Sequence, residues 1–185
     1  MIDLAQLWLP ILLSAIAVFV ASSLIHMVLQ WHKSDYQKLP NEDEVRMAIL
    51  NGRATPGQYM LPHCVTRPVG ESDIQRKFAE GPIGILALKA AGPPKMGPML
   101  LQWFVYVLLL GAVVAYLASR SLGPSAPFLN VFRLVATISF LAFVCGSIQN
   151  GIWMGRQWRS VALDGVDALI YGAVSGAIFG WLWPH

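Results

Sequence analysis

Residues 4–30 read LAQLWLPILLSAIAVFVASSLIHMVLQ, an apolar stretch that contains no Lys, Arg, Asp or Glu. A helix of about 20 residues is long enough to cross the hydrocarbon core of a bilayer, which is about 30 Å thick. The stretch therefore predicts a transmembrane helix. Only Asp3 and no basic residue precedes it, and the stretch is longer than the apolar core of a signal peptide, so we expect an uncleaved first span.

Three further apolar runs follow, at residues 99–119, 128–148 and 165–183. All seven tryptophans stand at the edges of the four runs, where an indole ring favours the headgroup level of a membrane. They are Trp8, Trp31, Trp103, Trp153, Trp158, Trp181 and Trp183. The pattern predicts an all-α membrane protein, a bundle of four transmembrane helices that forms a single membrane domain over residues 1–185.

Composition supports this class and excludes others. Hydrophobic residues make up 56% of the chain and charged residues 12%, whereas soluble domains carry about 25% charged residues. The net charge of +3 is small, and no basic stripe with interleaved aromatic residues points to nucleic acid. Cys64 and Cys145 are too few and too far apart to indicate a disulfide framework.

The distribution of basic residues predicts the orientation, because loops on the cytoplasmic side of a membrane are enriched in Lys and Arg. Five basic residues flank the link between spans one and two, and two more lie in the link between spans three and four. Only two basic residues lie on the opposite side of the predicted membrane. The seven are Lys33, Lys38, Arg46, Lys89, Lys95, Arg156 and Arg159, and the two are Arg120 and Arg133. We therefore expect both links in the cytoplasm and both termini outside.

The connection over residues 31–98 is the one sizeable aqueous segment that the pattern leaves. Helix start and stop signals predict short helices over 42–50 and 73–80, the second beginning after Ser72. Residues 53–70 are rich in Pro and Gly and indicate an ordered loop, and residues 83–88 indicate a strand or an extended segment. These elements are too small for an independent core, so we expect a small cytoplasmic cap of short helices and loops.

A ridge of small residues marks the fourth span: Ala168, Gly172, Gly176 and Gly180 each stand four positions apart. Small residues at this spacing allow the backbones of two membrane helices to approach closely. We interpret the ridge as a helix-packing face. It packs either within one bundle or against a second copy or another membrane subunit, and the sequence leaves both alternatives open.

Two carboxylates stand where the fourth apolar run begins. If a helix starts near Gly165, Asp164 is its N-cap residue and Asp167 lies in its first turn, where free backbone N–H groups stabilise negative charge. The pattern predicts a helix cap. The alternative is a pair of carboxylates that binds a proton or a cation, since a spacing of three places both on one helix face.

Four residues are candidates for a metal site at the cytoplasmic rim: His26, His32, His63 and Cys64. Imidazole and thiolate are ligands that suit Zn or Cu. Their spacing matches no established ligand motif, so the alternative is that they make ordinary structural contacts. The chain contains no G-x-S-x-G, P-loop or dinucleotide-binding fingerprint.

Several short segments together resemble a group of small uncharacterised bacterial four-pass integral membrane proteins. The resemblance spans most of the chain and implies a bacterial inner-membrane location, but it brings no activity, cofactor or catalytic residue. The segments that carry it are HKSDY (32–36) with LP (39–40), PHC (62–64), EGP (80–82), GPP (92–94), QWF (102–104) and GWLWP (180–184).

The sequence thus favours a non-enzymatic membrane protein with a structural or accessory role, exercised through helix packing. Its expected partners are the lipid bilayer and, through the ridge, a second copy or another subunit. One alternative is a metal- or redox-binding membrane protein with a site at the cytoplasmic rim. The other is a permease for a small uncharged solute, since no charge lies near the middle of a predicted span. No cofactor is required by the sequence.

Overall fold

The computed structural model describes residues 2–64 and 72–184. Its internal contacts divide the chain into two compact units, which are described separately below. The membrane unit comprises Met1–Asp35 and Lys95–His185, and the connection unit comprises Tyr36–Pro94. The sequence analysis predicts a single membrane domain over the whole chain. In the structure, residues 36–94 form a separate compact unit.

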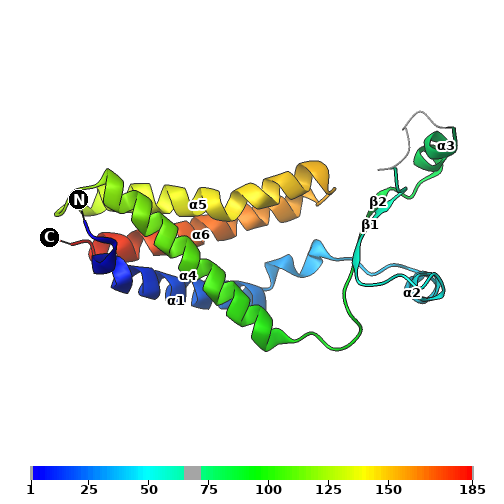
Figure 1. Cartoon of the computed structure of the whole chain (residues 1–185), viewed down its shortest axis with the longest axis horizontal. Helices are drawn as coiled ribbons and strands as arrows, with labels where there is room; N and C mark the ends of the chain where they lie inside the picture. Colours follow the sequence, from blue (N-terminus) through cyan, green and yellow to red (C-terminus); the bar gives the residue numbers. More distant parts are fainter. Residues whose placement is uncertain (1, 65–71, 185) are drawn as a thin grey trace. The chain divides into compact units, whose positions relative to one another are not determined.

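The membrane unit is a bundle of four long helices, as the apolar runs predict. All four are long and apolar enough to cross a membrane. Figure 1 shows the N-terminal end of α1 and the C-terminal end of α6 at the same end of this bundle. The helices are α1 (Trp8–Leu24), extended by single turns at Leu4–Leu7 and Ile25–Leu29, then α4 (Met96–Ser121), α5 (Phe128–Trp153) and α6 (Trp158–Trp181).

The predicted helix cap is wrong, because α6 begins seven residues before Gly165. Its N-cap residue is Gln157, and Asp164 and Asp167 lie in the second and third turns of the helix. The chain turns between α5 and α6 at Gly155, whose positive φ of 68° is easily adopted only by glycine. Helix α6 starts directly after this turn, so the two carboxylates meet partners outside the helix instead of free N–H groups.

Helices α5 and α6 pack closely over the glycine ridge. A Cβ atom at Gly172 would lie 2.7 Å from the carbonyl oxygen of Ala136, and one at Gly176 would lie 2.9 Å from that of Phe132. At Gly180 it would lie 2.6 Å from the ring of Phe128. Helix α5 of the same chain therefore covers the three glycines of the ridge. Ala168, the fourth residue of the ridge, is also buried.

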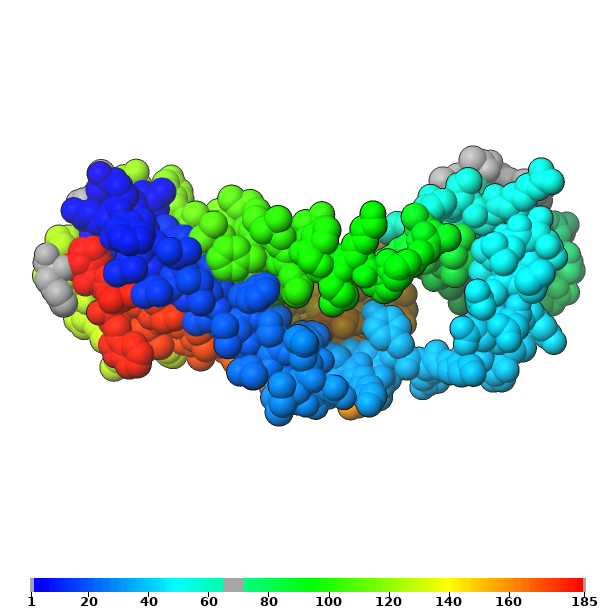
Figure 2. Space-filling view, turned by 90° about the horizontal axis from the view of Figure 1, so that it is seen from below, coloured from blue at the N-terminus to red at the C-terminus, as the bar shows by residue number. Residues whose placement is uncertain are grey.

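Helix α1 completes the bundle by packing against both α4 and α6. In Figure 2 the blue first helix lies between the green α4 and the red end of α6. Pro10 is tolerated because it stands in the first turn of α1, where the backbone needs no N–H donor. Buried side chains form one cluster around Phe179 and a second around Tyr171.

The end of α1 redirects the chain towards α6. Its last turn, Ile25–Leu29, is π-helical, and Gln30 then adopts a left-handed conformation with φ 51°. A 3₁₀ turn follows over Trp31–Asp35 and contacts α6. This change of direction places His26 and His32 on consecutive turns at one end of the bundle.

The connection unit contains α2 (Glu42–Asn51), β1 (Gly57–Leu61), α3 (Ser72–Glu80) and β2 (Gly84–Leu88). Both short helices and the extended segment are confirmed. Strand β1 was expected to be loop; it pairs antiparallel with β2, with Tyr59 opposite Leu86. Residues 65–70 of that predicted loop lie outside the described residues.

Candidate functional site

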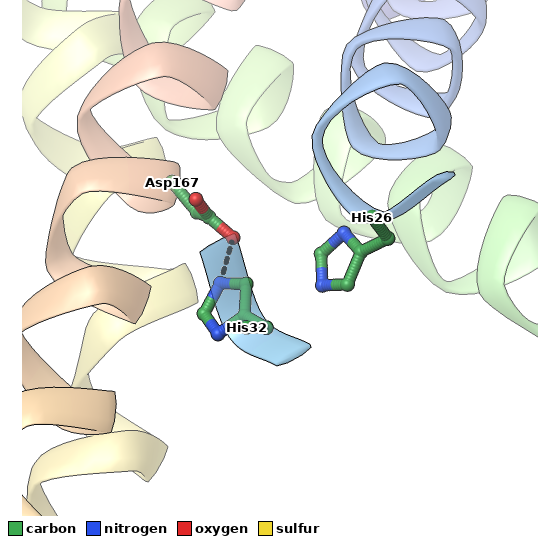
Figure 3. A group of neighbouring side chains, drawn as sticks. All are labelled: His26, His32 and Asp167. Atoms are coloured by element: carbon green, nitrogen blue, oxygen red, sulfur yellow. Dashed lines mark hydrogen bonds and ion pairs between the residues drawn. The ribbon is translucent and has the colours of Figure 1, made fainter. Parts of the chain in front are cut away.

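The candidate site begins with His32, which lies between two carboxylates. Its Nε2 atom is 3.0 Å from Oδ2 of Asp167 on α6 (Figure 3), and its Nδ1 atom is 2.8 Å from Oδ2 of Asp35. The indole N–H of Trp31 donates to the other oxygen of Asp167 at 3.1 Å. The side chains of His32, Asp35 and Asp167 are 13%, 6% and 8% exposed, so the contacts are largely shielded from water.

His32 and Asp35 lie beyond the end of the first span, and their surroundings shift the pKa values of both side chains. Burial by itself lowers the pKa of His32, but hydrogen bonds and negative charge from Asp35 and Asp167 outweigh it, so the pKa is raised. Burial by itself raises the pKa of Asp35, but contacts with His32, Ser160 and Arg156 outweigh it, so that pKa is lowered. Both shifts favour an imidazolium paired with a carboxylate.

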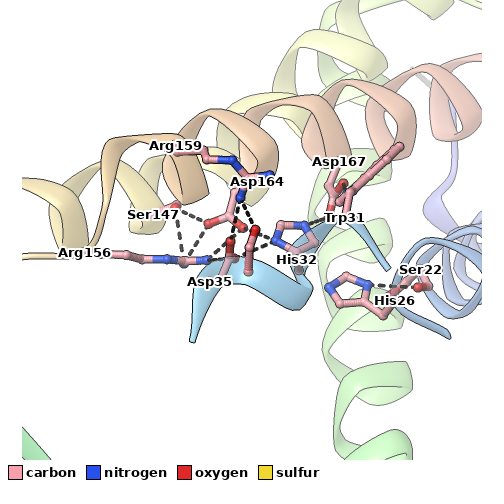
Figure 4. A network of polar contacts seen from close by, with 11 residues as sticks. Ser22, His26, Trp31, His32, Asp35, Ser147, Arg156, Arg159, Asp164 and Asp167 are labelled. Carbon is pink, nitrogen blue, oxygen red and sulfur yellow. Dashed lines mark hydrogen bonds and ion pairs between the residues drawn. The ribbon is translucent and has the colours of Figure 1, made fainter. Parts of the chain in front are cut away.

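Two arginines extend the network on the side away from His26 (Figure 4). Arg156 binds both oxygens of Asp164, at 2.7 Å and 3.0 Å, and Asp164 also accepts a short hydrogen bond from Ser147. Arg159 lies 3.7 Å from Asp35 and donates to Ser34. Asp164 thus takes its partners from α5 and the α5–α6 turn, and Asp167 takes its partners from the 3₁₀ turn.

The charges of this network balance only when His32 carries a proton. The network holds three carboxylates and two guanidinium groups: those of Arg156 and Arg159 contact Asp35 and Asp164, whereas Asp167 contacts His32. With a neutral His32 the five charges sum to −1, and with an imidazolium they sum to zero. The site therefore favours one additional positive charge beside Asp167.

His26 brings a second imidazole to this position (Figure 3). Its ring lies parallel to that of His32, with 5.0 Å between ring centroids and 6° between planes. Each of His26, His32 and Asp167 offers one potential metal-ligand atom, and these three atoms lie within 4.8 Å of one another. His26 is exposed while Asp167 is buried, so the group lies at the edge of the buried network.

Hydrogen bonding fixes which imidazole nitrogens carry lone pairs. Nδ1 of His26 is 2.9 Å from the carbonyl oxygen of Ser22. A carbonyl oxygen only accepts, so Nδ1 holds the hydrogen and Nε2 of the neutral ring keeps its lone pair. If Nδ1 of His32 likewise donates to Asp35, its Nε2 lone pair faces a carboxylate. Two acceptors at this distance need a cation between them, either a proton or a metal ion.

The structure brings together only part of the predicted metal set. His26 and His32 are neighbours, whereas His63 and Cys64 belong to the connection unit. Sequence reasoning did not place Asp167 beside these histidines: it predicted a helix cap and, as the alternative, a pair with Asp164 that binds a proton or a cation. The spacing of three residues between His32 and Asp35, within one helical turn, was the available signal for that pair.

Comparison with other proteins adds no assignment. No protein-family model, no curated protein and no solved structure matches this chain. The site must therefore be interpreted from its own geometry.

Proposed function

We propose that this chain is an integral membrane protein that binds a divalent transition-metal ion, preferably Zn²⁺, through His26, His32 and Asp167. The observation that carries the proposal is the convergence of these three side chains within 4.8 Å from three separate turns of the chain. Two imidazoles and one carboxylate form a donor set that Zn²⁺ uses in sites with an open fourth position.

The contacts behind the three ligands support the same proposal. Metal-binding histidines usually donate their second N–H to a carboxylate or a backbone carbonyl, which orients the ring. Asp35 takes this position behind His32, and the Ser22 carbonyl takes it behind His26. Trp31 holds the second oxygen of Asp167, which leaves Oδ2 directed at His32.

Binding requires one modest movement. Ligand atoms about 2.0–2.1 Å from a tetrahedral Zn²⁺ are roughly 3.3 Å apart. The 3.0 Å between His32 Nε2 and Asp167 Oδ2 already approaches this separation. His26 has to move closer, and its side chain is exposed on the last turn of the first span.

Metal binding is tested on detergent-purified full-length protein that has been stripped with EDTA and titrated with Zn²⁺ against a chromogenic chelator. We expect about one Zn²⁺ per chain, and His26→Ala is expected to weaken the affinity by more than about tenfold. His26 is the preferred position for substitution because it contacts the Ser22 backbone and the His32 ring and takes no part in the buried ion pairs described above.

Matched controls come from the other unit of the chain. His63→Ala and Cys64→Ser are expected to leave the Zn²⁺ affinity unchanged, as they lie outside the proposed ligand set. The proposal fails if the stripped wild-type protein takes up no Zn²⁺. It also fails if His26→Ala binds as tightly as the wild type.

A structural role through self-association finds less support, because α5 of the same chain covers the glycine ridge. For location we propose a bacterial inner membrane with both termini outside. The basic residues around the two predicted cytoplasmic links support this orientation.

The orientation is tested by labelling single cysteines introduced after Cys64→Ser and Cys145→Ser. Gln58→Cys and Gln157→Cys should react only from the cytoplasmic side, and Gly123→Cys only from the outside, because four spans place the first two positions in the same compartment. Opposite labelling of positions 58 and 157 contradicts the four-span arrangement.

A further inference from the structure

A cleft of about 590 Å³ opens within the membrane unit between α1, α4, α5 and α6. This volume is in the range of small-molecule sites, which is roughly 300–1,000 Å³. His26, Asp164 and Asp167 contribute to its lining, so the cleft adjoins the site described above. Most of the remaining lining is apolar or aromatic and includes Met27, Met96, Leu100, Trp103, Phe143 and Tyr171.

The aromatic wall is formed by side chains that support one another. The ring centroids of Phe143 and Tyr171 are 5.1 Å apart, and Trp103 lies 6.1 Å from Phe143 and 6.4 Å from Tyr171. Such contacts hold the rings in place, so the wall is preformed. Aromatic faces attract organic cations as well as apolar chains.

Two carboxylates of the charged network line the cleft, and among the described residues its two arginines do not. Asp164 and Asp167 line it, whereas neither Arg156 nor Arg159 is among the described residues that do. Figure 4 agrees with this arrangement, because it shows both arginines on the side of the carboxylates opposite His26. A ligand in the cleft therefore contacts these two carboxylates and neither arginine.

A buried hydroxyl supplies a second, independent indication of a ligand. Tyr171 is 4% exposed and lines the cleft, and its hydroxyl lies beside Ser22. Within the described part of the chain this hydroxyl makes no hydrogen bond of ordinary geometry. Leaving such a group without a partner costs free energy, so a donor or acceptor brought by a ligand would be stabilised here.

We propose that the cleft binds an amphipathic cation, a long-chain primary amine in its protonated form. Its alkyl chain lies along Met27, Met96 and Leu100, and its ammonium group lies towards Asp167, where it can donate to the Tyr171 hydroxyl. This ligand goes beyond the metal site, although both use the negative charge at one end of the cleft.

The test compares three probes that share a twelve-carbon chain: dodecylamine, dodecanol and laurate. Binding is measured by calorimetry at pH 7 with EDTA, on full-length protein in phosphatidylcholine nanodiscs, after subtraction of empty nanodiscs. We expect dodecylamine to bind at least about tenfold more tightly than dodecanol, because a carboxylate near the ammonium contributes roughly 1–2 kcal/mol. Laurate should not bind above background. Equal affinities for the three probes would overturn the proposal.

Variants locate the binding. Leu100→Trp places a bulkier side chain in the path of the alkyl chain and should weaken dodecylamine binding at least about tenfold, and Tyr171→Phe should weaken it several-fold by removing the acceptor oxygen. Asp43→Asn removes an exposed carboxylate of the connection unit and should leave the affinity unchanged. Unchanged binding by both Leu100→Trp and Tyr171→Phe places the amine elsewhere and refutes the proposal.

Zn²⁺ separates this proposal from the proposed function. A divalent cation at His26, His32 and Asp167 repels an ammonium group, so added Zn²⁺ should weaken dodecylamine binding in the wild type but not in His26→Ala. Amine binding in EDTA without any Zn²⁺ uptake supports the cleft and refutes the metal site. Zn²⁺ uptake without selective amine binding does the reverse.

Discussion

Gly172→Leu is expected to separate α5 from α6 and to lower the free energy of unfolding by about 3 kcal/mol, the upper end of the usual cost of overpacking. Its Cβ alone would lie 2.7 Å from the Ala136 carbonyl oxygen and 3.3 Å from the Phe140 backbone nitrogen. Backbone atoms cannot rotate away as a side chain can, so the two helices must move apart. Gly176→Leu should act in the same way, since its Cβ would lie 2.9 Å from the Phe132 carbonyl oxygen. Unfolding in mild detergent, followed by circular dichroism, measures the effect.

Gly146→Leu is the matched control for these variants. It also lies inside a membrane helix, but an added Cβ there would meet no described atom within 4 Å. We expect little or no loss of stability at this position. If Gly172→Leu is as stable as Gly146→Leu, the close packing of α5 on α6 is contradicted.

Asp35→Ala is expected to destabilise the metal-free protein by about 3 kcal/mol, because removing one partner of a buried ion pair leaves the other uncompensated. The Asp35 carboxylate is 6% exposed and faces three cationic groups: His32 at 2.8 Å, Arg159 at 3.7 Å and Arg156 at 3.8 Å. Its loss should release the 3₁₀ turn Trp31–Asp35 from α6. The midpoint of thermal unfolding and proteolysis near residue 35 both report this change.

Asp43→Ala provides the comparison for this prediction. Asp43 also pairs with an arginine, but its side chain is 94% exposed and that of Arg46 is 66% exposed. Exposed pairs contribute about 0–1 kcal/mol, so the stability should barely change. Equal stability of Asp35→Ala and Asp43→Ala would show that the buried network does not hold the 3₁₀ turn in place.

The four spans were predictable because each is encoded by local composition. The first runs without a charged residue from Leu4 to Leu29, and bilayer thickness sets the length that matters. The glycine spacing on α6 was equally visible as a packing face. Its partner was not, because Phe132 and Ala136 on α5 have no feature in the sequence that marks them as the receiving surface.

The charged site depended on long-range geometry that local patterns do not contain. His32 and Asp167 are 135 residues apart and meet only because a π turn and Gln30 redirect the chain after α1. Gly165 looked like a helix start, yet the helix begins at Trp158, directly after the turn at Gly155. Strand β1 was missed for a similar reason, since its pairing partner β2 lies beyond α3.

The bidentate contact between Arg156 and Asp164 has a consequence for biogenesis. The two residues are eight positions apart on one hairpin, so their opposite charges can neutralise each other as soon as α5 and α6 emerge together. The charge of Asp164 on α6 can then be neutralised before α6 packs against the other helices. Asp167 instead pairs with Trp31 and His32, which were synthesised more than a hundred residues earlier, so the burial of its charge depends on the first span being in place.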